Sequence, residues 1–182
     1  MVLIRGFGRY PELPSMQEVY GLDPVGIAGY PMYRGIARVV GMETPDTDWD
    51  VDAELELLTA RWQAGTEDFY YVHIKKTDSA GEDGDFDRKV SLLEEVDARL
   101  PRILDLQPRA LVVTGDHSTP SRMASHSWHP VPVVIASDVG IPMPGAQLTE
   151  RSCGNGSLGR IPSTELMALA LAHAGRLAKF GA

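Results

Sequence analysis

A carboxylate and two imidazoles stand close together in one segment of the sequence. Asp116 and His117 are adjacent, directly after a run of apolar, β-branched residues, and His126 follows in the same segment. Carboxylate oxygens and imidazole nitrogens are ligands that suit zinc, manganese or magnesium. Because open α/β sheets place their chemistry at the carboxyl ends of strands, this segment is a candidate metal-binding loop.

An upstream segment repeats this layout. The β-rich run 69–74 ends in a turn that is crowded with carboxylates and glycines. In this turn Asp78 and Glu82 are separated by one helical turn in sequence, so a short helix or a compact loop can direct both at the same cation. A solvated acidic loop is the alternative for this segment taken alone. Two strand ends of the same character favour a metal site.

The elements expected to position these residues alternate along the chain. Apolar β-rich runs predict strands, and apolar residues at helical spacing predict helices. The predicted strands are 25–28, 69–74, 110–113 and 132–136, and the predicted helices are 32–40, 51–63, 86–104 and 163–179. Strands that alternate with helices predict an α/β fold with a mostly parallel sheet flanked by helices. We expect residues 1–24 to be loop.

The composition fits one domain and excludes some classes of partner. The chain has 182 residues, of which 43% are hydrophobic, enough for a core. Its net charge of −8 argues against nucleic acid, because binding phosphates needs a basic face. The lone cysteine, Cys153, cannot form an internal disulfide, which favours a reducing cytoplasm. The sequence has no apolar run near about 18 residues and no signal-peptide pattern, so we expect a soluble cytoplasmic protein with no membrane partner.

Several longer motifs give the chain a resemblance to a known family. They are RGFG at Arg5, IAGYPMYRGIARVVGM from Ile27, VHIKKTDSAGEDGDF followed by Lys89, TGDHSTP, HSWHPVPV and ERSCGNGSLGRIPSTELM. Together these motifs resemble the cofactor-independent phosphoglycerate mutases, and more narrowly the archaeal-type branch. That family belongs to the alkaline phosphatase superfamily. The resemblance runs nearly from end to end of the chain.

The resemblance implies that residues 1–182 form the C-terminal part of a phosphatase-like metal-binding domain. In the family, an N-terminal strand supplies an aspartate ligand, a later loop supplies a serine that is transiently phosphorylated, and an inserted domain helps to clamp phosphoglycerate. None of these precedes Arg5. We therefore expect an alkaline-phosphatase-like fold that lacks the N-terminal strand and the inserted domain, with no catalytic nucleophile in this chain. The expected partner is the missing N-terminal half or a second copy of the chain.

The resemblance also implies ligands for two divalent cations. Asp78, the position of Glu82, and His126 would hold one cation, and Asp116 and His117 would hold the other. The family has histidine where this chain has Glu82. Glutamate adds negative charge and an oxygen ligand, so we expect manganese or magnesium in preference to zinc.

Two arginines are candidates for binding the phosphoglycerate substrate. Arg34 stands where relatives often carry a lysine, and a guanidinium there could bind phosphate bidentately. Arg5 lies in the RGFG turn. The alternatives are a solvated helix charge for Arg34 and an ordinary tight turn at Arg5.

The implied activity is that of a glycolytic isomerase, a 2,3-bisphosphoglycerate-independent phosphoglycerate mutase. It interconverts 3-phosphoglycerate and 2-phosphoglycerate through a phosphoserine and two divalent metals. Because the nucleophile is expected outside this chain, we do not expect the chain alone to be a competent mutase. Two alternatives stay open: a non-catalytic metal- or partner-binding module from a truncated gene, and a weak metallophosphatase.

Overall fold

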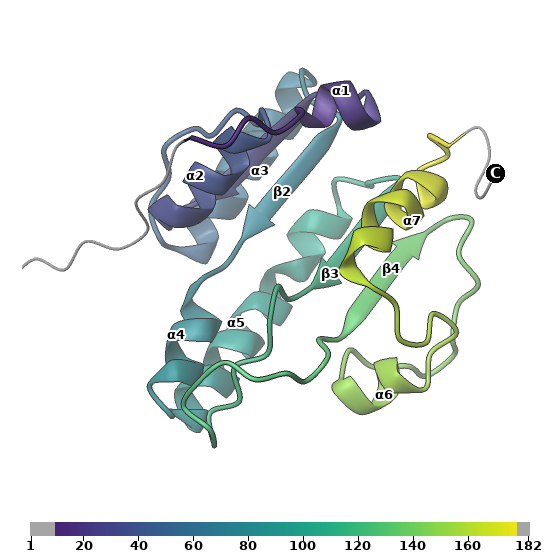
Figure 1. The fold of residues 1–182 in the computed structure, drawn as a ribbon. Coiled ribbons are helices and arrows are strands. Elements are labelled where there is room, and N and C mark those ends of the chain that lie inside the picture. Colours follow the sequence, from purple (N-terminus) through teal and green to yellow (C-terminus); the bar gives the residue numbers. More distant parts are fainter. Residues whose placement is uncertain (1–9, 178–182) are drawn as a thin grey trace, which may run out of the picture. The chain divides into compact units, whose positions relative to one another are not determined.

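The computed structural model describes residues 10–177, and their contacts divide the chain into two compact units with the boundary between Thr77 and Asp78 (Figure 1). Each unit holds one two-stranded sheet together with helices. None of the helices within residues 10–177 is long and apolar enough to cross a membrane.

The first unit is built on a parallel pair of strands. Strand β1 (Pro24–Ala28) pairs with β2 (Phe69–His73), so that Val25 lies opposite Tyr70. Parallel strands need a crossover connection. The helices α2 (Pro31–Val39) and α3 (Val51–Ala64) supply it, and both pack against β1.

The core of the first unit lies between β1 and these helices. Val25 and Ile27 are fully buried on β1, and Leu55 and Leu58 are buried on α3, where they recur at helical spacing. Burying an aliphatic side chain of this size contributes about 1.5–3 kcal/mol. These residues therefore hold α3 against the sheet.

The expectation that residues 1–24 form a loop is wrong at α1 (Met16–Tyr20). Glu18 N donates to the Ser15 hydroxyl at 3.1 Å, and Ser15 N donates to the Glu18 carboxylate at 2.8 Å. This reciprocal cap satisfies two backbone donors, and Gly21, with φ 64°, ends the helix. A five-residue helix is too short to show periodicity, so only its cap could have indicated it.

The second unit is built on an antiparallel pair, β3 (Ala110–Thr114) and β4 (Val133–Ser137). Segment 115–132 joins these strands without a helix, and antiparallel strands need no crossover. The predicted α/β class is confirmed, and its parallel pairing is found in the first unit. Helix α7 (Leu166–His173) packs on both β3 and β4. It is shorter than the predicted helix 163–179 and follows a 3-10 turn, Ser163–Glu165.

Three further helices complete the second unit. They are α4 (Lys76–Glu82), which starts at the end of the first unit, α5 (Phe86–Leu104) and α6 (Glu150–Gly154). The Asp85 side chain accepts from Arg88 N at 3.0 Å and so begins α5. Helix α4 and segment 115–132, named here the β3–β4 loop, carry the candidate metal ligands.

Candidate metal centre

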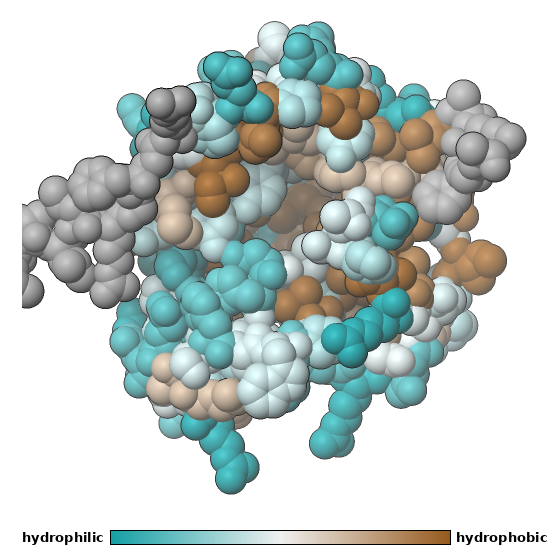
Figure 2. Space-filling view, in the orientation of Figure 1, coloured by the Kyte–Doolittle hydropathy of each residue, from teal (hydrophilic) through white to brown (hydrophobic). Residues whose placement is uncertain are grey.

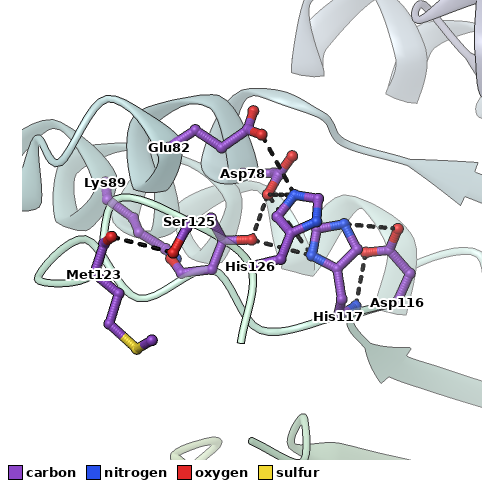
Figure 3. A network of polar contacts seen from close by, with 9 residues as sticks. Asp78, Glu82, Lys89, Asp116, His117, Met123, Ser125 and His126 are labelled. Carbon is purple, nitrogen blue, oxygen red and sulfur yellow. Dashed lines mark hydrogen bonds and ion pairs between the residues drawn. The ribbon is translucent and has the colours of Figure 1, made fainter. Parts of the chain in front are cut away.

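The residues predicted for the first cation converge from two segments. Asp78 and Glu82 lie one turn apart on α4, and their side chains are 15% and 48% exposed. His126 comes from the β3–β4 loop. Its Nε2 lies 3.6 Å from Asp78 Oδ1 and 3.4 Å from Glu82 Oε1 (Figure 3). The structure therefore brings these three predicted ligands together.

The pair predicted for the second cation follows β3 directly. Asp116 Oδ2 lies 3.4 Å from His117 Nε2. The other carboxylate oxygen, Asp116 Oδ1, accepts from the backbone N–H of His117 at 3.0 Å. This hydrogen bond between sequence neighbours holds the Asp116 carboxylate beside the His117 imidazole.

The residues predicted for the first cation lie next to the pair predicted for the second. The His117 and His126 rings have centroids 3.9 Å apart, and His117 Nδ1 lies 3.8 Å from Asp78 Oδ1. One ligand atom from each of Asp78, His117 and His126 lies within 4.8 Å of the other two. The assignment of the residues to two separate cations stays a prediction, because these distances also fit a single cluster of three.

The donor set suits a divalent cation. The carboxylates of Asp78, Glu82 and Asp116 gather here with the imidazoles of His117 and His126. Ligand bonds of about 2.1 Å at a tetrahedral angle place neighbouring ligand atoms roughly 3.4 Å apart. The separations of 3.4 Å and 3.6 Å around His126 Nε2 match that value and exceed hydrogen-bond length. A cation would also offset the repulsion between the carboxylates.

Close packing holds α4 against the β3–β4 loop. Gly81 lies on α4 where a Cβ would collide with the carbonyl oxygen of Thr119, so this position needs glycine. Lys89 Nζ donates to the same carbonyl oxygen at 2.6 Å. The carbonyl oxygen of Thr119 thus holds the loop close to α4 at Gly81 and to α5 at Lys89.

Thr119 is a residue of the centre that the sequence interpretation missed. The residue is 4% exposed, and its hydroxyl donates to Asp78 Oδ1 at 2.5 Å and lies 3.0 Å from His117 Nδ1. A metal-binding histidine commonly bonds through its other ring nitrogen to a fixed partner. The presence of polar residues next to His117 in the sequence could therefore have indicated Thr119 as a hydrogen-bond partner of this histidine.

A cavity of about 540 Å³ opens beside Asp116 and His117 within the second unit. Its lining includes one permanently cationic side chain, Arg160, together with Ser163 and the exposed indole of Trp128. Arg160 belongs to the GRIPST segment of the sequence, which carried no functional assignment. The cavity therefore adds a cationic group to the surroundings of the predicted metal ligands.

Of the two predicted substrate-binding arginines, the structure describes Arg34. Arg34 is on α2 in the first unit, where its guanidinium forms an ion pair with Asp46 and its side chain is 19% exposed. Arg5 lies outside the described residues. Substrate binding by Arg34 and Arg5 stays a prediction.

The fold and this centre agree with the match to a family of known proteins. A model of the metalloenzyme superfamily matches residues 2–173 of the chain. The chain belongs to the metalloenzyme superfamily.

Individual relatives narrow the resemblance. The probable 2,3-bisphosphoglycerate-independent phosphoglycerate mutase of Thermotoga neapolitana is 52% identical over 180 residues, which cover 99% of this chain and 44% of that protein. The resemblance noted from the sequence motifs is thereby confirmed. The chain spans less than half the length of this curated relative.

Two solved structures share the fold. A protein from Pyrococcus horikoshii matches with a TM-score of 0.90 and 29% identity, over 98% of this chain and 57% of that one. The cofactor-independent phosphoglycerate mutase from Thermoplasma acidophilum matches with a TM-score of 0.67 and 24% identity, over 91% of this chain and 40% of that one. The α/β fold of this chain is therefore that of part of such proteins.

Proposed function

We propose that this chain is the metal-binding part of a 2,3-bisphosphoglycerate-independent phosphoglycerate mutase, an isomerase that interconverts 3-phosphoglycerate and 2-phosphoglycerate in glycolysis. The observation that carries the proposal is the convergence of Asp78 and Glu82 with His126, at 3.4–3.6 Å, from two segments of one unit. The name of the Thermotoga neapolitana relative supports it.

In this proposal the candidate ligands divide into two sets. Asp78, Glu82 and His126 hold one divalent cation, while Asp116 and His117 contribute to a second. Bound cations would polarise the phosphoryl oxygens and offset the charge that develops during transfer. Because Glu82 adds an oxygen ligand, the proposed metal is manganese or magnesium in preference to zinc. The nucleophilic serine is proposed to lie in the part of the relatives that this chain does not span.

We place phosphoglycerate in the cavity beside Asp116 and His117. Its volume of about 540 Å³ falls in the range of small-molecule sites. In this position Arg160 binds an anionic group of the ligand, because a guanidinium presents paired donors to a carboxylate or phosphate. Arg34 and Arg5 are further proposed phosphate contacts, and Arg34 must exchange its Asp46 partner to act as one.

Ligand binding tests the role of Arg160. We expect 3-phosphoglycerate to change the fluorescence of the manganese-loaded chain, because the exposed Trp128 lines the cavity. Arg160→Gln should weaken binding about 10-fold or more, since a hydrogen bond to a charged group contributes about 1.5–3 kcal/mol. Arg109→Gln removes the same charge from an exposed position outside the cavity lining and serves as the control. Equal affinities for the two variants would remove Arg160 from the proposed site.

An assay coupled through enolase tests the proposed activity. The purified chain alone should show no mutase turnover, because loss of a nucleophilic serine costs on the order of 10⁶ in kcat in the protease subtilisin. Adding the remaining segment of a relative, in cis or in trans, should restore turnover, and His117→Ala should remove it again. Clear turnover by the isolated chain would show that the proposed nucleophile is not required. A restored activity that survives His117→Ala would contradict the proposed metal ligand.

We also propose that a further protein surface covers the second unit, supplied by the part of the relatives that this chain does not span or by a second copy of the chain. Helix α5 is 19 residues long and contains no buried residue. Several large apolar side chains of this unit are exposed, among them Phe86 at 68% and Ile141 at 96%. Figure 2 shows hydrophobic side chains (brown) at the surface beside hydrophilic ones (teal). Such surface favours association.

A further inference from the structure

The Thr119 hydroxyl is shared by two candidate metal ligands that come from different segments. It donates to Asp78 Oδ1 at 2.5 Å and lies 3.0 Å from His117 Nδ1. The residue is 4% exposed, so these side chains and not bulk water satisfy its hydroxyl. The role of the Thr119 hydroxyl as donor or acceptor toward His117 therefore depends on its role toward Asp78.

The proton count of this hydroxyl fixes the direction of both bonds. A threonine hydroxyl has one proton to donate and two lone pairs that accept. An ionised carboxylate can only accept, so the proton goes to Asp78, in agreement with the short, charge-assisted contact. The oxygen of Thr119 is then left as an acceptor toward His117 Nδ1. That nitrogen must carry the proton in order to donate to it.

A neutral imidazole has only one protonated nitrogen. If Nδ1 of His117 carries the proton, the lone pair lies on Nε2, the nitrogen that faces Asp116 Oδ2 at 3.4 Å. The nitrogen that faces Asp78 Oδ1 at 3.8 Å is then not available to bind a metal. This bonding distinguishes two arrangements of the centre that distances alone leave open.

We propose that Thr119 is a positioning residue that holds His117 in the Nδ1-protonated tautomer and so directs its Nε2 ligand to the Asp116 side of the centre. His117 then pairs with Asp116 and does not join Asp78 and His126 on one cation. The proposal concerns the metal centre alone, and it does not depend on the substrate or on mutase activity.

Contacts at its backbone carbonyl restrain the position of Thr119. Lys89 Nζ donates to its carbonyl oxygen at 2.6 Å, and Gly81 lets α4 approach the same carbonyl without a Cβ in the way. Threonine at this position is therefore held on its backbone side while its hydroxyl faces the two ligands. A hydroxyl can select one tautomer of His117 only if its orientation is fixed. A freely rotating hydroxyl could form a hydrogen bond with either tautomer.

Nitrogen-15 NMR of the metal-free chain, labelled at histidine, tests the proposal directly. At a pH where the imidazoles are neutral, His117 should show the Nδ1-protonated pattern, with its signals assigned by their loss in His117→Gln. Thr119→Val keeps the side-chain shape but removes the hydroxyl, and it should give a mixture of tautomers. Thr119→Ser should restore the wild-type pattern. An Nε2-protonated His117 in the wild-type chain would overturn the proposal whether or not the variants fold.

Metal affinity gives a second readout on the same variants. Loss of a partner that supports a metal ligand typically weakens metal binding 10–100-fold. Because the Thr119 hydroxyl also supports Asp78, a proposed ligand of the tightly held cation, we expect that loss for manganese in Thr119→Val and its recovery in Thr119→Ser. Ser125→Ala is the matched control, because the Ser125 hydroxyl belongs to the same neighbourhood but donates to the backbone oxygen of Met123 at 3.2 Å (Figure 3). A folded Thr119→Val with wild-type affinity and an unchanged tautomer would also overturn the proposal.

Discussion

The Thr119 hydroxyl and the Asp78 carboxylate lie 2.5 Å apart, although 41 positions separate them in the sequence. This bond joins helix α4, which follows the strand β2, to the loop that follows the strand β3. The candidate metal ligands on these segments are therefore positioned by contacts between the segments and not by either segment alone. Changes to that packing should alter metal binding even where no ligand is replaced.

Gly81→Ala is the smallest change that tests this coupling. A methyl group there would collide with the Thr119 carbonyl oxygen, so α4 and the loop must separate. We expect calorimetry to show manganese binding weakened about 10–100-fold, as for other losses of ligand support. Gly35→Ala on α2 is the control, because its Cβ would meet no atom within 4 Å; it should bind like the wild type. An unchanged affinity in Gly81→Ala would refute the coupling.

Glu82→His tests why this chain differs from the family pattern. The change replaces an oxygen ligand by a nitrogen ligand beside His126, and nitrogen ligands favour zinc. We expect the ratio of zinc to manganese affinity to rise about 10-fold, measured by competition against a chelator. The neighbouring Asp83→His is the control, because that carboxylate faces Arg88 at 3.7 Å. The same ratio in Glu82→His and the wild type would show that Glu82 is not a ligand.

Glu54 should make the stability of the chain depend on pH. Its side chain is 4% exposed and accepts from Gly29 N at 3.0 Å, and burial raises its pKa from 4.5 to about 7. Between these values the folded state binds the proton and the unfolded state does not. The free energy of unfolding should therefore fall as pH rises from about 4.5 to 7, by up to about 3 kcal/mol in total.

Glu54→Gln should remove this fall, because an amide does not titrate and its oxygen can still accept from Gly29. Urea unfolding followed by circular dichroism at pH 5 and pH 8 measures the effect. We expect the variant to gain stability relative to the wild type at pH 8 and to match it more closely at pH 5. An equal pH dependence in both proteins would mean that Glu54 is already ionised when folded at pH 5.

The uncovered surface of the second unit should lead to association. Neither β3 nor β4 contains a buried residue, and within residues 10–177 these two strands pair only with each other, which leaves an edge on each for further pairing. We expect light scattering to report a dimer, or a complex when the remaining segment of a relative is supplied. A monodisperse monomer at high concentration, with little binding of a hydrophobic dye, would count against association with a second copy and with the remaining segment of a relative.

The sequence predicted those parts of the fold that depend on local pattern. The β-rich run 69–74 and the helical spacing of apolar residues in 86–104 are visible in the sequence, and the helices between β1 and β2 predict their parallel pairing. The spacing of Asp78 and Glu82 likewise predicted a shared direction, which α4 supplies. That these residues ligate a metal stays a prediction, although the structure places them beside His126.

The features of the fold and the site that the sequence did not predict depend on contacts between segments that are distant in the sequence. The antiparallel pairing of β3 with β4 accords with a connecting loop without a helix. The sequence analysis predicted no helix between these two strands but extended the expectation of a mostly parallel sheet to them. Thr119 gains its importance only when the loop folds onto α4 at Gly81. Arg160 lines a cavity with His117 because the chain returns to that place after β4. Such contacts arise from the tertiary fold.

Manganese titration of the chain, by calorimetry, tests the central claim that α4 and the β3–β4 loop form a metal centre. In the proposed assignment, Asp78, Glu82 and His126 supply three ligands to one cation, whereas Asp116 and His117 supply only two to the other. We therefore predict one tightly bound manganese ion per chain, lost or greatly weakened in Asp78→Ala. The absence of tight binding, two equally tight sites, or an Asp78→Ala variant that binds like the wild type would contradict this account.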